Sequence, residues 1–130
     1  MTMARALTTM FLATVTLWGC IGTDDEALPP AYLGIETRLL DDQMVNFRVA
    51  IRHAEALSTV EDYAACAAAQ YALIRGHGFA RHVRTNVNRK GAVTLADAVY
   101  LISSTLPKGV ATIDAETTVR DCSARGIPTV

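Results

Sequence analysis

The sequence lacks several features that identify common functional classes. Its formal net charge is −1, which argues against a general nucleic-acid binder, because such proteins usually carry a strong basic excess. There is no C-x₂-C pair, and the spacing of Cys66, His77 and His82 is not that of a zinc site. There is also no G-x-S-x-G motif, no phosphate-cradling glycine loop and no evident Ser/His/Asp arrangement. We therefore predict no metal, no cofactor and no catalytic residue, and the sequence indicates no specific reaction.

Long apolar runs are also missing. A transmembrane helix needs about 20 consecutive apolar residues, whereas the apolar stretch near the N-terminus covers only residues 8–18. This stretch follows a single cation, Arg5, and has the length of the apolar region of a signal peptide. No later segment is long and apolar enough to span a bilayer. The N-terminus therefore predicts export.

The apolar stretch ends at Leu17-Trp18-Gly19-Cys20, which resembles a bacterial lipobox. The resemblance implies that residues 1–19 are a cleaved lipoprotein signal peptide and that Cys20 is lipidated. Trp18 departs from the lipobox pattern, in which this position is usually small or β-branched. Two alternatives remain, an ordinary secretory signal and a buried N-terminal strand of a cytoplasmic protein.

Lipidation of Cys20 predicts attachment to a lipid bilayer, since acyl chains contribute about 0.8 kcal/mol per buried CH₂. The protein would then face the periplasm from the cell envelope; secretion to the periplasm is the alternative localisation. Residues 20–30 are polar, acidic and end in two prolines, which suits a tether. We predict one folded domain over residues 31–130.

Three cysteines are an odd number, and lipidation of Cys20 leaves Cys66 and Cys122. An exported chain enters an oxidising space, where two thiols tend to form a disulfide. We therefore predict a Cys66–Cys122 disulfide; the alternative is two unpaired buried cysteines.

The folded region is predicted as a small α+β domain of order ββαβββ, with one Ala-rich helix packed on an antiparallel sheet of about five strands. Residues 32–53 alternate apolar and polar positions about a turn-forming Leu-Asp-Asp-Gln segment, which favours a β-hairpin over a helix. Residues 58–76 are rich in alanine and predict a helix, with Ser58 and Glu61 as a capping box and Gly76 as its stop.

Three strands are predicted to follow. The segment Val93–Ser103 is apolar on both faces, which indicates a central strand. The last strand carries Ile113, Ala115 and Val119 on one face, opposite Asp114 and Glu116. In that register Cys122 lies on the polar face, which conflicts with the predicted disulfide unless the strand ends or bulges.

The stretches "CAAAQYALIRGHGFARHVRTNV" and "TIDAETTVRDCSARGIPTV" resemble those of small uncharacterised bacterial envelope lipoproteins. The resemblance covers most of residues 32–130. It implies a compartment and an architecture, and it implies no catalytic residue.

The most distinctive polar run lies after the predicted helix. No acid occurs between Asp62 and Asp97. Within that interval Arg75, Arg81, His82 and Arg84 form a candidate site for an anion such as a lipid headgroup, a phosphate or a glycan carboxylate. The alternative is an ordinary solvated face, with Arg81 paired to Asp97 or Glu116 across the sheet.

Three functions remain open from the sequence. The first is a non-enzymatic envelope lipoprotein that binds or stabilises another envelope protein. The second is a periplasmic binder of a small anionic ligand through the Arg75, Arg81 and Arg84 region. The third is a small hydrolase with an unrecognised site.

Overall fold

The computed structural model describes residues 28–130, so the predicted signal peptide, Cys20 and most of the predicted tether lie outside the described residues. The elements along the chain are β1 (Ala31–Leu39), β2 (Met44–Arg52), α1 (Leu57–Ile74), β3 (Phe79–Lys90), β4 (Val93–Ser103), β5 (Thr112–Asp114) and α2 (Ala115–Ala124). The five strands form one antiparallel sheet in the order β1-β2-β4-β3-β5. The predicted α+β class and antiparallel sheet are confirmed.

The first two strands form the predicted hairpin. Alternate residues of β2 point into the core, where Val45, Phe47, Val49 and Ile51 are almost completely buried. The turn is closed by Asp41, whose Oδ1 accepts hydrogen bonds from the backbone N–H groups of Gln43 (2.9 Å) and Met44 (2.7 Å). The period of two in β2 therefore decides in favour of the hairpin over the helical alternative.

Helix α1 forms where the alanines predicted it, but its ends differ from the prediction. Its N-cap is Ala56 and receives no side-chain hydrogen bond, so the predicted Ser58–Glu61 capping box is wrong. Its C-terminal end has the expected glycine, Gly76, at a φ of 78°. The N–H groups of Gly76 and His77 donate back to Leu73 and Ala72, as in a Schellman motif.

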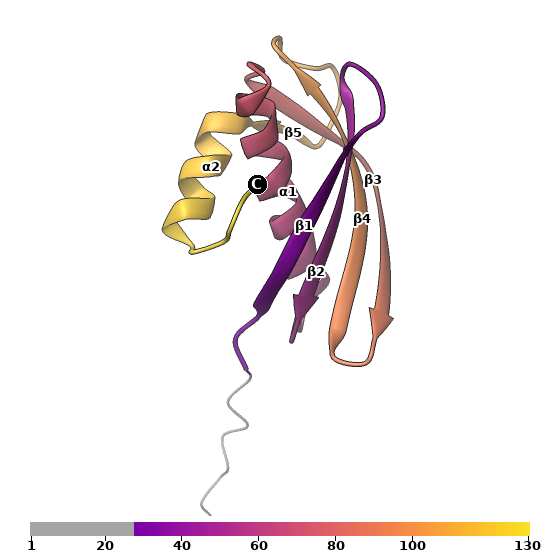
Figure 1. Ribbon diagram of the computed structural model, residues 1–130. Coiled ribbons are helices and arrows are strands. Elements are labelled where there is room, and N and C mark those ends of the chain that lie inside the picture. The colour runs from indigo at the N-terminus through magenta and orange to yellow at the C-terminus, as the bar shows by residue number, and fades with distance from the viewer. Residues whose placement is uncertain (1–27) are drawn as a thin grey trace, which may run out of the picture.

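The small alanines of α1 let the helix pack closely on two sides. It contacts β2, β3 and β4 on one side and α2 on the other, and Ala64, Ala67, Ala68 and Ala72 are completely buried. Strand β4, predicted to be central, lies between β2 and β3. Figure 1 shows both helices on the same side of the sheet.

The end of the chain departs from the sequence prediction. The predicted last strand stops at Asp114, and residues 115–124 form a second helix, α2. Asp114 is its N-cap and accepts a hydrogen bond from the N–H of Thr117 (2.9 Å), while Glu116 lies in the favourable first turn. Asp114 and Glu116 are therefore helix-start residues and not a pair on one strand face.

Helix α2 also removes the difficulty with Cys122. In a helix, Ala115, Val119 and Cys122 share one face, and Ala115 and Cys122 are buried. The sulfur atoms of Cys66 and Cys122 are at disulfide distance, 1.99 Å, with Cα atoms 6.0 Å apart. The disulfide joins α1 to α2, and α1 in turn lies on the sheet.

Candidate binding surface on the open face of the sheet

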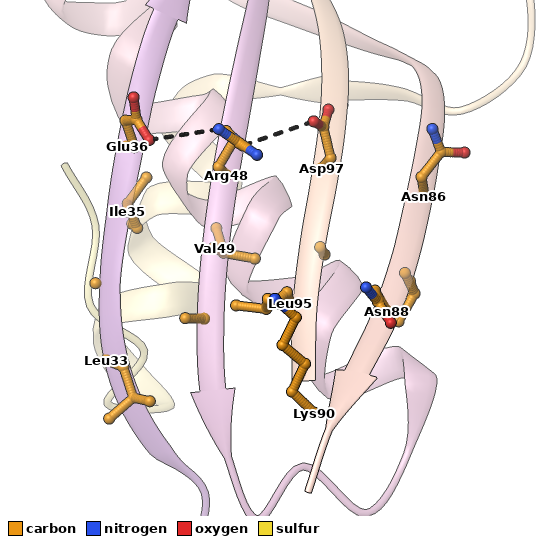
Figure 2. A pocket seen from close by; sticks show the side chains of 14 residues that line it. Leu33, Ile35, Glu36, Arg48, Val49, Asn86, Asn88, Lys90, Leu95 and Asp97 are labelled. Atoms are coloured by element: carbon orange, nitrogen blue, oxygen red, sulfur yellow. Dashed lines mark ion pairs between the residues drawn. The ribbon is translucent and has the colours of Figure 1, made fainter. Parts of the chain in front are cut away.

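The face of the sheet turned away from the helices is here called the open face. Polar and charged side chains gather on it from β1, β2 and β3, whereas β4 contributes Asp97 and mainly apolar residues. Cross-strand pairing places residues of four strands in rows across it. The central row contains Glu36 of β1, Arg48 of β2, Asp97 of β4 and Asn86 of β3. Figure 2 shows this row pointing out of the sheet while the helices lie behind.

Arg48 lies between two carboxylates in this row. Its guanidinium is 3.9 Å from Glu36 and 3.8 Å from Asp97, and the three side chains are between 39% and 54% exposed. Asp97 also accepts a hydrogen bond from Asn46 Nδ2, which contacts the Ala98 carbonyl oxygen as well (3.4 Å). Such exposed pairs contribute little to stability. Because the three charged side chains are exposed, the row is accessible to a partner.

A hollow of about 610 Å³ lies beside this row. Leu33, Ala50 and Leu95 are among the apolar residues that line it. Asn86, Asn88 and Lys90 add polar groups on the β3 side (Figure 2). Its volume falls within the usual range of about 300–1,000 Å³ for ligand sites. The hollow combines apolar contact area with charged groups along its margin.

The open face carries an excess of positive charge. Strand parity in β1 to β4 places six basic side chains on it, against the two acids Glu36 and Asp97. The basic side chains are Arg38, Arg48, Arg52, Arg81, Arg84 and Lys90. Elsewhere residues 28–130 carry eight acidic and five basic residues, so the basic excess of the domain is confined to the open face.

The four residues predicted as an anion site do not assemble into one cluster. Arg81 and Arg84 lie on the open face, opposite Leu101 and Val99 of β4. A register shift between His82 and Arg84 puts both arginines on the same face. His82 instead pairs with Tyr100 on the helix side, and Arg75 is the C-cap residue of α1.

His82 is held on the helix side by two contacts. Its Nε2 shares a 2.7 Å hydrogen bond with Thr85 Oγ1, and its ring lies edge-on to that of Tyr100 at 5.2 Å. Neither contact involves an acid. Within residues 28–130, no group of three or more His, Cys, Asp or Glu side chains is placed to hold a metal ion.

Arg81 pairs with neither of the acids proposed for it. Asp97 contacts Arg48, and Glu116 belongs to α2. The Nε of Arg81 and the Oγ1 of Thr112, at paired positions of β3 and β5, are buried with no hydrogen-bond partner in the described part of the chain.

Sequence reasoning missed most of the surface, since only Arg81 and Arg84 of its six basic residues were among the predicted site residues. Arg38, Arg48 and Arg52 come from β1 and β2, far in the sequence from Arg81 and Arg84. The sequence did contain a signal for Arg48 and Arg52. The polar positions of β2 alternate with its buried ones, so the polar side chains must share a face. What the sequence did not supply was the strand order, which places β2 and β3 on either side of β4.

Comparison with known proteins places the chain in a family. Residues 32–126 match the YNQ4 C-terminal domain. The chain belongs to this family. The matched residues run from the second residue of β1 to just beyond α2, so the YNQ4 C-terminal domain contains nearly all of the fold described above.

An uncharacterised bacterial protein is also similar to the chain. It is the 26.9 kDa protein in the nqo8 5′ region of Paracoccus denitrificans, and it is 31% identical over 87 residues. The aligned part is 67% of this chain and 34% of the relative, so the chain spans about a third of the relative's length. No solved structure matches the chain. The predicted likeness to uncharacterised bacterial proteins is thus confirmed.

Among residues 28–130, neither helix is long and apolar enough to cross a membrane.

Proposed function

We propose that this YNQ4 C-terminal domain is a non-catalytic binding domain of the bacterial cell envelope, anchored through Cys20, and that its open face binds an anionic partner. The observation that carries the proposal is the charge of that face, six basic side chains against two acidic ones in a chain of net charge −1. A face of one predominant sign attracts ligands of the opposite sign over about a Debye length.

Two further observations support this function over the alternatives. The Cys66–Cys122 pair is at disulfide distance, which suits an oxidising compartment outside the cytoplasm. The titratable side chains of the open face are mostly arginines, whose charge persists at all physiological pH values. Such residues bind anions well and are poor general acids or bases, so the surface favours binding over hydrolysis.

The proposal is tested with the full chain carrying Cys20→Ser, which removes the acylation site. We expect this protein to bind vesicles containing phosphatidylglycerol, or soluble polyglutamate, more tightly than vesicles of phosphatidylcholine alone. The double reversal Arg81→Glu with Arg84→Glu should weaken binding by about tenfold or more, because each site loses one attraction and gains one repulsion. Added salt should weaken binding of the unreversed protein.

A matched control makes the same charge change elsewhere. Arg75→Glu with Arg120→Glu alters the C-cap of α1 and the exposed surface of α2, and it should leave most of the binding intact. Equal losses in the two double variants would contradict a role for the open face, and so would binding of neither anionic probe.

A further inference from the structure

The first strand of the sheet has an unpaired outer edge. Strand β1 pairs with β2 on one side, and no strand among residues 28–130 pairs with the other. A free edge presents backbone N–H and C=O groups that can accept another strand. At nine residues β1 is long for such an edge.

The features that usually protect an edge are limited in β1. Its bulge lies at the beginning, between Tyr32 and Gly34. From Ile35 to Leu39 the strand pairs residue by residue with β2, so this part of the edge is regular. Its two charges, Glu36 and Arg38, have opposite signs and lie on the same face, where they contact one another at 2.7 Å.

This charge pattern selects one register for pairing with a second copy of β1. If a two-fold axis keeps both open faces on one side, residues that face each other must have the same parity. An axis at Glu36 opposes two glutamates, and an axis at Arg38 opposes two arginines. An axis at Thr37 places Glu36 opposite Arg38 of the second copy, twice, with no like charges directly opposite each other.

The other face of β1 agrees with this register. Ile35 is half-buried against the core and Leu39 is 43% exposed, and both lie on the helix side of the sheet. With the axis at Thr37, Ile35 faces Leu39 of the second copy. Both apolar side chains would lose exposed area, which favours association.

We propose that β1 pairs with β1 of a second copy, antiparallel and centred on Thr37, to form a symmetric dimer with one continuous sheet. The occupant of the edge is a second copy because the strand is self-complementary in charge and in apolar contacts. The two open faces then lie next to each other as a single basic surface. This inference does not depend on the identity of the anionic partner.

Cysteine cross-linking tests the register in the full chain carrying Cys20→Ser. Thr37→Cys should form an intermolecular disulfide, because the two new thiols face each other across the axis. Glu36→Cys and Arg38→Cys should not cross-link when each is alone, but a mixture of the two should. Cross-linking of Arg38→Cys with itself, or none from Thr37→Cys, would overturn the proposed pairing.

A charge test measures the association itself. Sedimentation of the Cys20→Ser chain should show a dimer that dissociates on dilution. Arg38→Glu should raise the dissociation constant by about tenfold or more, because two attractive pairs become repulsive. Arg52→Glu makes the same change on the open face of β2, away from the seam, and should have little effect. Circular dichroism would check that each variant is folded. A chain that stays monomeric at every concentration, with its edge free or covered by another segment, would overturn the dimer.

Discussion

Tyr100 has its phenol ring in the core, on the helix side of β4. Its ring lies edge-on to those of Phe47, at 6.1 Å, and His82, at 5.2 Å. Burial raises the pKa of Tyr100 from 10.0 to about 12, and the negative charges of Glu61 and Asp62 add to the rise. The folded protein therefore holds this proton more tightly than the unfolded chain does.

We expect this shift to weaken the fold at alkaline pH. Since the folded pKa lies above the unfolded one, the stabilisation is complete below pH 10 and is lost as the pH rises toward about 12. The whole loss is about 3 kcal/mol. In Tyr100→Phe, urea unfolding should show a shallower fall in the free energy of unfolding over this interval, after correction for any difference at neutral pH. Parallel curves for the two proteins up to pH 12 would contradict this account.

Among the secondary-structure elements, α2 packs on α1 and has two further links to the rest of the fold. One is the Asp114 cap, which turns the chain from β5 into the helix. The other is the Cys66–Cys122 disulfide, which closes a segment with a sequence separation of 56 residues. Helix α2 makes most of its contacts with α1 and few with the sheet, so the disulfide holds an element that the sheet does not cover.

Loss of the disulfide should therefore destabilise the protein and loosen α2 first. The chain-entropy treatment gives about 4 kcal/mol for a loop of this size. The double variant Cys66→Ser with Cys122→Ser should unfold at lower urea concentration, and amide hydrogen exchange should increase more in residues 115–124 than in β2 or β4. The unmodified chain under a thiol reductant should show the same pattern. Uniform exchange across the sheet and both helices would mean that α2 is not a separately released element.

Some of these elements could be predicted from sequence patterns and others could not. Strands β2 and β4 and helix α1 have long periodic or alanine-rich segments, and their positions were predicted. The prediction of a strand from Ile113 to Val119 was wrong beyond Asp114. Over so short a distance, the apolar residues of this segment fit a strand and a helix about equally well. The capping hydrogen bond of Asp114 decides between them. Predicting which residues share the open face also requires the strand order. That order comes from long-range pairing, which no local sequence pattern contains.

For the whole molecule, the main property is the separation of charge between two sides. The open face is basic, whereas α1 and α2 carry four acids, Glu61, Asp62, Glu116 and Asp121, and one basic residue, Arg120. Arg125, just beyond α2, contacts Asp62 of α1 and lies 3.2 Å from Asp121, so part of the acidic charge is neutralised within the helix layer. Net charge conceals this arrangement, because the two sides nearly cancel.

A membrane anchor at Cys20 would hold the basic face close to the lipid surface. Lipidation of Cys20 can be tested directly. In a bacterium that produces the protein, the native chain should incorporate labelled palmitate and Cys20→Ser should not. Since Trp18 is the only tryptophan, removal of residues 1–19 should also leave a mature protein without tryptophan fluorescence, and its intact mass should lack those residues. Label retained by Cys20→Ser, or a mature mass that still includes Met1 to Gly19, would contradict lipidation. The basic face would then require an anionic partner away from the membrane surface.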